Sequence, residues 1–157
     1  MPRAGSGRAV GSVPWGRRER LTVVGALALD GVVAAMSVAA AAATSTAVSL
    51  AFVEQALVPA LKERPDAVVV MDNLAAHEAE AVRGALDRAG LAYRYLPPYS
   101  PDLDPIEEGW SKLKTRLRAE GARSREALEA ALGPALAAIT AQDARGWFRL
   151  AGYPAPE

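Results

Sequence analysis

The stretch AVVVMDN, residues 67–73, is a short apolar run that ends abruptly in two polar residues. Its three consecutive valines favour a β-strand, and the lack of polar alternation indicates a central strand covered on both faces. Asp72 and Asn73 follow that strand directly, and ligand sites of open α/β sheets lie beyond the carboxyl ends of their strands. Asp72 is therefore a candidate site residue, although an Asp-Asn pair also forms ordinary turns.

Helical and strand patterns alternate around this run, which predicts one α/β domain. One expected helix is closed by Gly90, and another begins with Thr140 and Asp143 at the spacing of a capping box. The expected elements are helices over residues 45–63, 76–89, 124–138 and 141–150 and a strand over residues 91–96.

Two β-branched segments lie upstream, LTVVGALAL at 21–29 and GVVAAMSVA at 31–39. They are joined at Asp30-Gly31, a common hairpin turn, so we expect two antiparallel strands. The competing interpretation is an export signal or a membrane span, because residues 31–53 carry no charge and an arginine-rich segment precedes them. Asp30 and a cluster of hydroxyl residues oppose it, so we predict a cytoplasmic protein without a membrane partner. Residues 1–18, rich in glycine and arginine, are expected to form a mobile arm.

The composition excludes several kinds of chemistry. Lysine plus arginine and aspartate plus glutamate number 18 each among the 157 residues, so no global positive field indicates a nucleic-acid partner. There is no cysteine, which excludes thiolate catalysis and disulfides. His77 is the only histidine, and no nucleophile elbow accompanies it.

The stretch LPPYSPDLDPIEEGW, residues 96–110, sets up the start of a helix. Its prolines make a stiff approach, Asp104 suits the N-cap and Pro105 the first helical position. Apolar residues then recur with helical spacing and predict one buried stripe, formed by Ile106, Trp110, Leu113 and Leu117. In that phase Glu107 lies on the flank of the stripe and Glu108 points to solvent.

Asp72 and Glu107 are thus two rigidly placed carboxylates, the kind of oxygen ligand that Mg²⁺ takes together with water and substrate phosphate. The plainer alternative for Glu107 is the third position of a capping box that reaches back to Asp104.

Several segments together resemble the DDE transposases of the mariner superfamily, in particular their bacterial insertion-sequence branch. They are VVVMDNLAAH (68–77), YLPPYSPDLDPIEEGWSKLK (95–114), TVVGALALDGVVA (22–34), FVEQALVPAL (52–61) and DARGWFRLAGY (143–153). Thirty-four residues separate Asp72 from Glu107, an interval typical of that superfamily. The resemblance covers roughly residues 10–154.

The resemblance implies an RNase H-like mixed sheet flanked by helices, in which two aspartates and a glutamate hold two Mg²⁺ or Mn²⁺ ions. These ions would support cleavage and strand transfer at phosphodiesters of transposon ends. By correspondence Asp72 and Glu107 are the second and third catalytic metal ligands. Asn73 and His77 match positions near the site, and a cap or phosphate contact is the preferred role of His77.

Departures from the family pattern limit this inference. The first catalytic aspartate has no counterpart, so the sequence resembles an N-terminally truncated transposase. Residues 19–154 are then a partial catalytic domain whose sheet lacks its first strand. Asp104 stands where relatives usually carry asparagine, and Glu78 stands where a basic residue often follows the histidine. We therefore expect the chain to be inactive by itself.

The second functional class is a non-catalytic remnant that binds DNA, forms a homodimer or pairs with full-length transposase. The charge clusters fit contacts with phosphates, or else an ordinary solvated surface. The candidate DNA-binding residues are Lys112, Lys114, Arg116 and Arg118. A phosphoacceptor receiver domain is a weaker third reading, because the paired acids of its first strand are missing.

Overall fold

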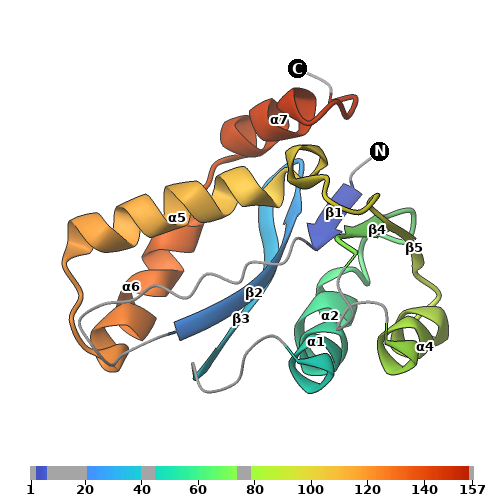
Figure 1. The fold of residues 1–157 in the computed structure, drawn as a ribbon, viewed down its shortest axis with the longest axis horizontal. Helices are drawn as coiled ribbons and strands as arrows, with labels where there is room; N and C mark the ends of the chain where they lie inside the picture. The colour runs from blue at the N-terminus through green and yellow to red at the C-terminus, as the bar shows by residue number, and fades with distance from the viewer. Residues whose placement is uncertain (1–2, 7–20, 40–44, 74–78, 156–157) are drawn as a thin grey trace.

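Five strands form one mixed sheet with helices on both faces (Figure 1). The computed structural model describes residues 3–6, 21–39, 45–73 and 79–155, the first of these ranges by its backbone. The strands are β1 (Arg3–Ser6), β2 (Leu21–Ala28), β3 (Gly31–Ala39), β4 (Val68–Met71) and β5 (Ala92–Tyr95), in the order β3-β2-β1-β4-β5. The helices are α1 (Thr46–Phe52), the π-helical turn η1 (Val53–Leu57), α2 (Val58–Ala60), α4 (Glu80–Arg88), the 3₁₀ turn η2 (Pro101–Leu103), α5 (Ile106–Glu120), α6 (Arg125–Ala137) and α7 (Ala141–Leu150).

The predicted hairpin is confirmed, since β2 and β3 pair antiparallel. Gly31 has a φ of 125° in its turn, a conformation that side chains with a Cβ rarely adopt. Asp30 forms an ion pair with Arg64, which holds the pKa of this carboxyl below its usual value. Residues 31–39 are a strand, so the uncharged segment 31–53 is not one helical span. In the described ranges no helix is long and apolar enough to cross a membrane.

The prediction that the sheet lacks its first strand is wrong. Arg3–Ser6 lies between β2 and β4, antiparallel to the first and parallel to the second, and Ser6 is in register with Met71. An empty slot here would leave backbone groups of β4 without partners, and an extended segment can fill it whatever its side chains are. Four residues of the predicted arm thus belong to the sheet, while residues 1–2 and 7–20 lie outside the described part of the chain.

Side chains of β2 alternate between two hydrophobic cores, one on each face of the sheet. Leu21, Val23 and Leu27 pack in one core with residues of α5, α6 and α7. Val24 and Ala26 point into the other core, which α1, η1 and α4 cover. Both faces of the sheet are therefore buried, as the apolar run at residues 67–71 predicts.

The predicted helices are found with small changes at their ends. The helix expected over residues 45–63 spans Thr46 to Ala60 and contains a π-helical turn just before Pro59, which has no N–H to donate. The helix expected over residues 76–89 is described from Glu80 onward, because residues 74–78 lie outside the described ranges. Both C-terminal helices are confirmed, including the capping box of Thr140 and Asp143.

Candidate active site

Asp72 stands at the carboxyl end of the central parallel strand. β4 has β1 on one side and β5 on the other, and the Leu96 N–H donates to the Met71 carbonyl at 2.7 Å. Pairing on both sides fixes the backbone up to the residue before Asp72. The Asp72 side chain is half-buried and that of Asn73 is exposed.

The proline-rich segment runs from β5 to α5 as a loop and one 3₁₀ turn, held by local hydrogen bonds and by one bond from the segment after α7. Tyr99 has a φ of 57°, which marks a turn held by its surroundings because this region favours glycine. The Asp104 N–H donates to the Pro101 carbonyl at 3.1 Å, and the Tyr153 hydroxyl donates to the Leu103 carbonyl at 2.9 Å. The last of these ties the segment after α7 to η2, and Figure 1 shows η2 beside α7.

The start of α5 is close to the prediction. The helix begins at Ile106, and Pro105 already has helical angles. Asp104 is extended, its carboxyl accepts a hydrogen bond from the Ile106 N–H, and its carbonyl accepts one from the Glu107 N–H at 3.1 Å. The N-cap is therefore Pro105, one residue after the predicted Asp104, and it has no side-chain cap, while the predicted apolar stripe along α5 is buried. The Asp104 N–H already donates to the Pro101 carbonyl, so no capping box with Glu107 is needed to satisfy that N–H.

Asp72 and Glu107 line one cavity of about 720 Å³ at this edge of the sheet. The remaining lining residues are Asn73, Leu96, Pro97, Pro98, Tyr99, Ser100, Pro101 and Asp104. Glu107 and Glu108 are both exposed, but only Glu107 lines the cavity, as the helical phase predicts. His77 lies outside the described residues.

The sequence did not indicate that the Asp104 carboxyl is buried in the candidate site. It is 5 % exposed, and burial raises its pKa to about 7, with further contributions from the nearby charges of Glu107 and Asp72. The hydrogen bond from Ile106 opposes that rise only in part. Its replacement of asparagine was the available signal, but the substitution alone did not show that the carboxyl is buried beside two others.

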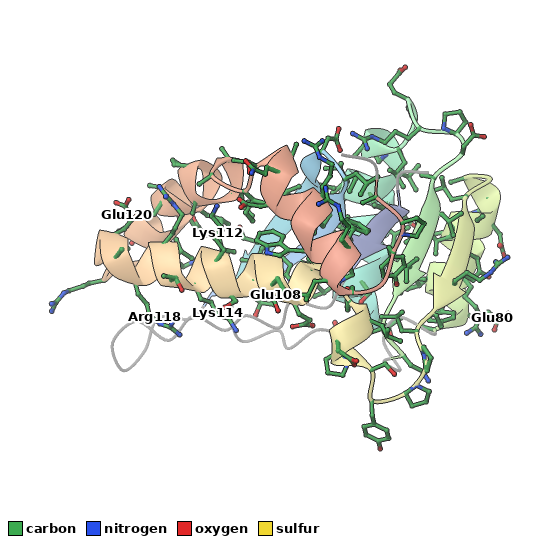
Figure 2. The ribbon with its side chains drawn as sticks, turned by 90° about the horizontal axis from the view of Figure 1, so that it is seen from above. Glu80, Glu108, Lys112, Lys114, Arg118 and Glu120 are labelled. Carbon is green, nitrogen blue, oxygen red and sulfur yellow. The ribbon has the colours of Figure 1, made fainter. Side chains whose placement is uncertain are left out.

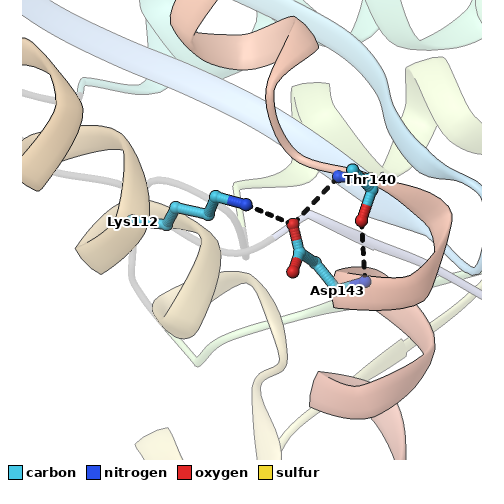
Figure 3. A network of polar contacts seen from close by, with 3 residues as sticks. All are labelled: Lys112, Thr140 and Asp143. Atoms are coloured by element: carbon cyan, nitrogen blue, oxygen red, sulfur yellow. Dashed lines mark hydrogen bonds and ion pairs between the residues drawn. The ribbon is translucent and has the colours of Figure 1, made fainter.

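The four candidate DNA-binding residues separate into two groups on α5. Lys112 forms an ion pair with Asp143 of α7, whose carboxylate also accepts from the Thr140 N–H (Figure 3). The Lys112 ammonium holds the pKa of Asp143 below its usual value. Figure 2 shows Lys114 and Arg118 on the other side of α5, together with Glu108. The side chain of Arg116 is exposed to solvent.

The donor set of the cavity fits a hard divalent cation. Asp72, Asp104 and Glu107 offer only oxygen, and Asp104 Oδ2 is buried without a hydrogen-bond partner among the described residues. Mg²⁺ binds through one or two carboxylates and keeps several waters, for which the cavity has room. Among the described residues no group of three histidine, cysteine or acidic side chains is placed so that it could hold a metal ion, so Asp72 and Glu107 would act as a pair.

The mixed five-stranded sheet with helices on both faces, and with Asp72 at the end of β4, is an RNase H-like fold. Residues 3–129 match the family model described as DDE superfamily endonuclease, and the chain therefore belongs to that family. No curated protein sequence matches it.

Solved structures share the fold. The Mos1 transposase catalytic domain with raltegravir and Mn superposes with a TM-score of 0.73 at 19% identity, covering 96% of this chain and 74% of that one. The Mos1 mariner paired end complex with Mn gives 0.65 at 21% identity, covering 88% and 41%. The catalytic core domain of BIV integrase gives 0.56 at 16% identity, covering 87% and 81%. At such identities the likeness establishes the fold alone.

We expect Tyr153→Phe to lower the free energy of unfolding by about 1 kcal/mol, because it removes the hydrogen bond to Leu103 and keeps the ring packed on Phe148. Urea denaturation followed by circular dichroism measures the change. An unchanged midpoint would show that Tyr153 does not hold η2.

Proposed function

We propose that this domain is the catalytic part of a DNA transposase, which acts on phosphodiesters at the ends of a mobile element. The observation that carries this proposal is the shared cavity of Asp72 and Glu107 at the end of β4. Family membership supports the same reaction class, and Mos1 neighbours have been solved with Mn, with Mg and as paired end complexes. A protein with this substrate would act in the cytoplasm.

Asp72 and Glu107 would hold Mg²⁺ or Mn²⁺ by their carboxylate oxygens. What the bound cation supplies is activation of the attacking oxygen and stabilisation of the leaving oxygen at the phosphodiester. The chain itself supplies placement: β4 fixes Asp72, and the bonds around Asp104 fix the first turn of α5, which carries Glu107. Rigid placement of catalytic groups is worth several orders of magnitude in rate.

We further propose that this chain does not cleave DNA by itself. A two-metal mechanism uses carboxylates that neutralise both ions, and the four residues of β1 beside Asp72 contain none. Loss of a single electrostatic stabiliser commonly costs about 10² to 10³ in rate, and loss of a shared ligand should cost at least as much.

The test is strand cleavage of labelled duplexes that carry the inverted repeats flanking the coding region, in Mg²⁺ and in Mn²⁺. We expect no product above that of Asp72→Ala and Glu107→Ala. Cleavage by the wild type that both substitutions abolish would contradict the proposed inactivity and support the reaction class. Cleavage that neither substitution changes would contradict the site.

Binding of transposon-end DNA without catalysis, as a homodimer or paired with full-length transposase, is the second candidate. The observation that favours it is the pair of cations Lys114 and Arg118 on one side of α5, combined with a β1 that has no acid. Backbone phosphates are the expected ligands of such side chains.

We expect Lys114→Ala and Arg118→Ala each to weaken binding of a fluorescein-labelled duplex and to reduce the slope of log K against log salt by about 1. Lys112→Ala is the matched control, because that ammonium is engaged by Asp143. Fluorescence anisotropy over a salt series measures both quantities. If Lys112→Ala lowers the slope as much as the other two, the proposed surface is misplaced.

A further inference from the structure

Tyr99 is an aromatic residue that the fold does not use. Its side chain is 101 % exposed, so its ring packs on none of the residues that the structure describes. Tyr153 shows the contrast, because its ring packs on Phe148 and its hydroxyl donates to the Leu103 carbonyl. The hydrophobic cores would therefore lose nothing if another residue stood at position 99.

The backbone at Tyr99 is held in a conformation that other residues adopt more readily. Its φ of 57° is the one positive value of a non-glycine residue in the described ranges, and glycine or asparagine tolerates this region best. The turn is nevertheless fixed, because the Ser100 hydroxyl donates to the Pro98 carbonyl at 3.2 Å and the Leu103 N–H donates to the Ser100 carbonyl at 3.1 Å. An exposed ring on a fixed and unfavourable turn indicates a role in function.

Tyr99 stands at the rim of the candidate active site. It lines the same cavity as Asp72 and Glu107, although its side chain is in solvent. The cavity lining has an acidic part and an apolar part, and the apolar part consists of Leu96, Pro97, Pro98, Tyr99 and Pro101. The volume of about 720 Å³ falls in the range of about 300–1,000 Å³ that is usual for sites of small organic ligands. The cavity therefore has room for a phosphate together with an apolar group attached to it.

A nucleobase is the flat, largely apolar group that accompanies a phosphodiester. A phosphodiester held beside Asp72 and Glu107 brings the base of its own nucleotide toward the cavity rim. An exposed aromatic ring binds the face of a base by stacking, and every base has such a face. Inside a duplex both faces of a base are covered by its neighbours in the stack, so only an unpaired base can be bound in this way.

We propose that Tyr99 stacks on an unpaired base next to the phosphodiester that lies between Asp72 and Glu107, and so selects DNA that is open at this nucleotide. The inference rests on the proposed function, in which these two carboxylates hold the cation at the phosphodiester. The fixed turn at residues 98–100 presents the ring before any ligand arrives, so stacking costs little ordering of the chain.

Fluorescence anisotropy with two labelled DNAs in Mg²⁺, a duplex with an unpaired 3′ end and its blunt counterpart, tests the inference. We expect the full chain to bind the DNA with the unpaired end more tightly by about 5-fold to 150-fold. Tyr99→Ala should abolish this preference and leave binding of the blunt duplex unchanged, whereas Tyr99→Phe keeps the ring and should keep the preference. Leu150→Ala is the control, because it removes an exposed apolar side chain that does not line the cavity.

Two further measurements separate base stacking from a structural role of Tyr99. The base analogue 2-aminopurine, placed at the unpaired end, should lose fluorescence on binding to the wild type and not on binding to Tyr99→Ala. Tyr99→Asn should not lower the midpoint of thermal unfolding, because asparagine tolerates the positive φ at this position. A lower midpoint would show that Tyr99 serves the fold and would overturn the inference.

The two DNAs also separate the inference from the proposed function. If the wild type binds both DNAs equally, or if Tyr99→Ala weakens both by the same factor, the inference about Tyr99 is overturned while the proposed function stands. If Tyr99→Ala changes the elution volume of the chain and not its preference between the DNAs, the ring serves a protein contact and the inference is overturned as well. If neither DNA binds at low salt, the proposed function loses its substrate too.

Discussion

In EDTA at pH 8, Asp104→Asn is expected to be more stable than the wild type by about 2–4 kcal/mol, and at pH 4 the two should be nearly equal. The reason is burial of the Asp104 carboxyl beside Asp72 and Glu107, which raises its pKa from 3.8 to about 7. Each unit of difference between the folded and unfolded pKa is worth about 1.4 kcal/mol. Asparagine keeps an acceptor for the Ile106 N–H and carries no charge.

The sign of the effect follows from the direction of the pKa shift. A raised pKa means that the folded state binds the proton more tightly, so the stabilising contribution of neutral Asp104 is complete below about pH 4. That contribution is lost as the pH rises to about 7. The advantage of the asparagine variant should therefore grow between these values and then level off.

Thermal unfolding of both proteins across this pH range measures the difference, which corresponds to roughly 4–16 °C in the midpoint for a chain of this size. Because other groups titrate in both proteins, the comparison isolates residue 104. Addition of Mn²⁺ at pH 8 should shrink the gap, since the cation stabilises the acid and not the amide. A gap that is independent of pH, or a wild type more stable at pH 8 in EDTA, would contradict the electrostatic account.

Trp110→Ala is expected to destabilise the protein by about 3–5 kcal/mol, the usual cost of removing a buried tryptophan side chain. Trp110 lies on the buried face of α5 and is 5 % exposed. It packs against β2, where a Cβ added at Gly25 would lie 2.9 Å from the Cη2 atom of Trp110. The same helix carries Glu107 three residues earlier. Loss of this contact should therefore loosen the candidate site together with the core.

Urea denaturation measures this change, with Leu150→Ala as the control because that side chain is 75 % exposed and should matter by less than about 0.5 kcal/mol. Gly25→Ala approaches the same contact from the strand, where overpacking costs about 1–3 kcal/mol. If Trp110→Ala and Leu150→Ala have similar midpoints, α5 is not anchored on β2 in this way.

Local chemistry made much of the fold predictable. The hairpin at Asp30, the strand before Asp72 and the cap at Thr140 follow from turn residues, an apolar run and a capping pattern, and all three are confirmed. These features depend on residues close together in the chain. The phase of α5 likewise placed Glu107 at the cavity and Glu108 outside it.

The failures involve contacts between distant segments. The sequence RAGS of residues 3–6 has little strand character, and it pairs with β4 because a central slot of the sheet needs backbone partners. The sequence does not distinguish Lys112 from the other cations of α5, because its ion pair with Asp143 of α7 depends on how the two helices pack. The burial of Asp104 depends on the packing of α5 and on the segment after α7, which capping rules do not specify.

The most direct test of a cation-binding DDE-type site is anomalous diffraction from crystals of the chain grown or soaked in MnCl₂. The account predicts an anomalous peak in the cavity at the end of β4, within coordination distance of oxygens from Asp72 and Glu107. An empty cavity beside well-ordered carboxylates, or a manganese peak held only by other residues, would contradict it.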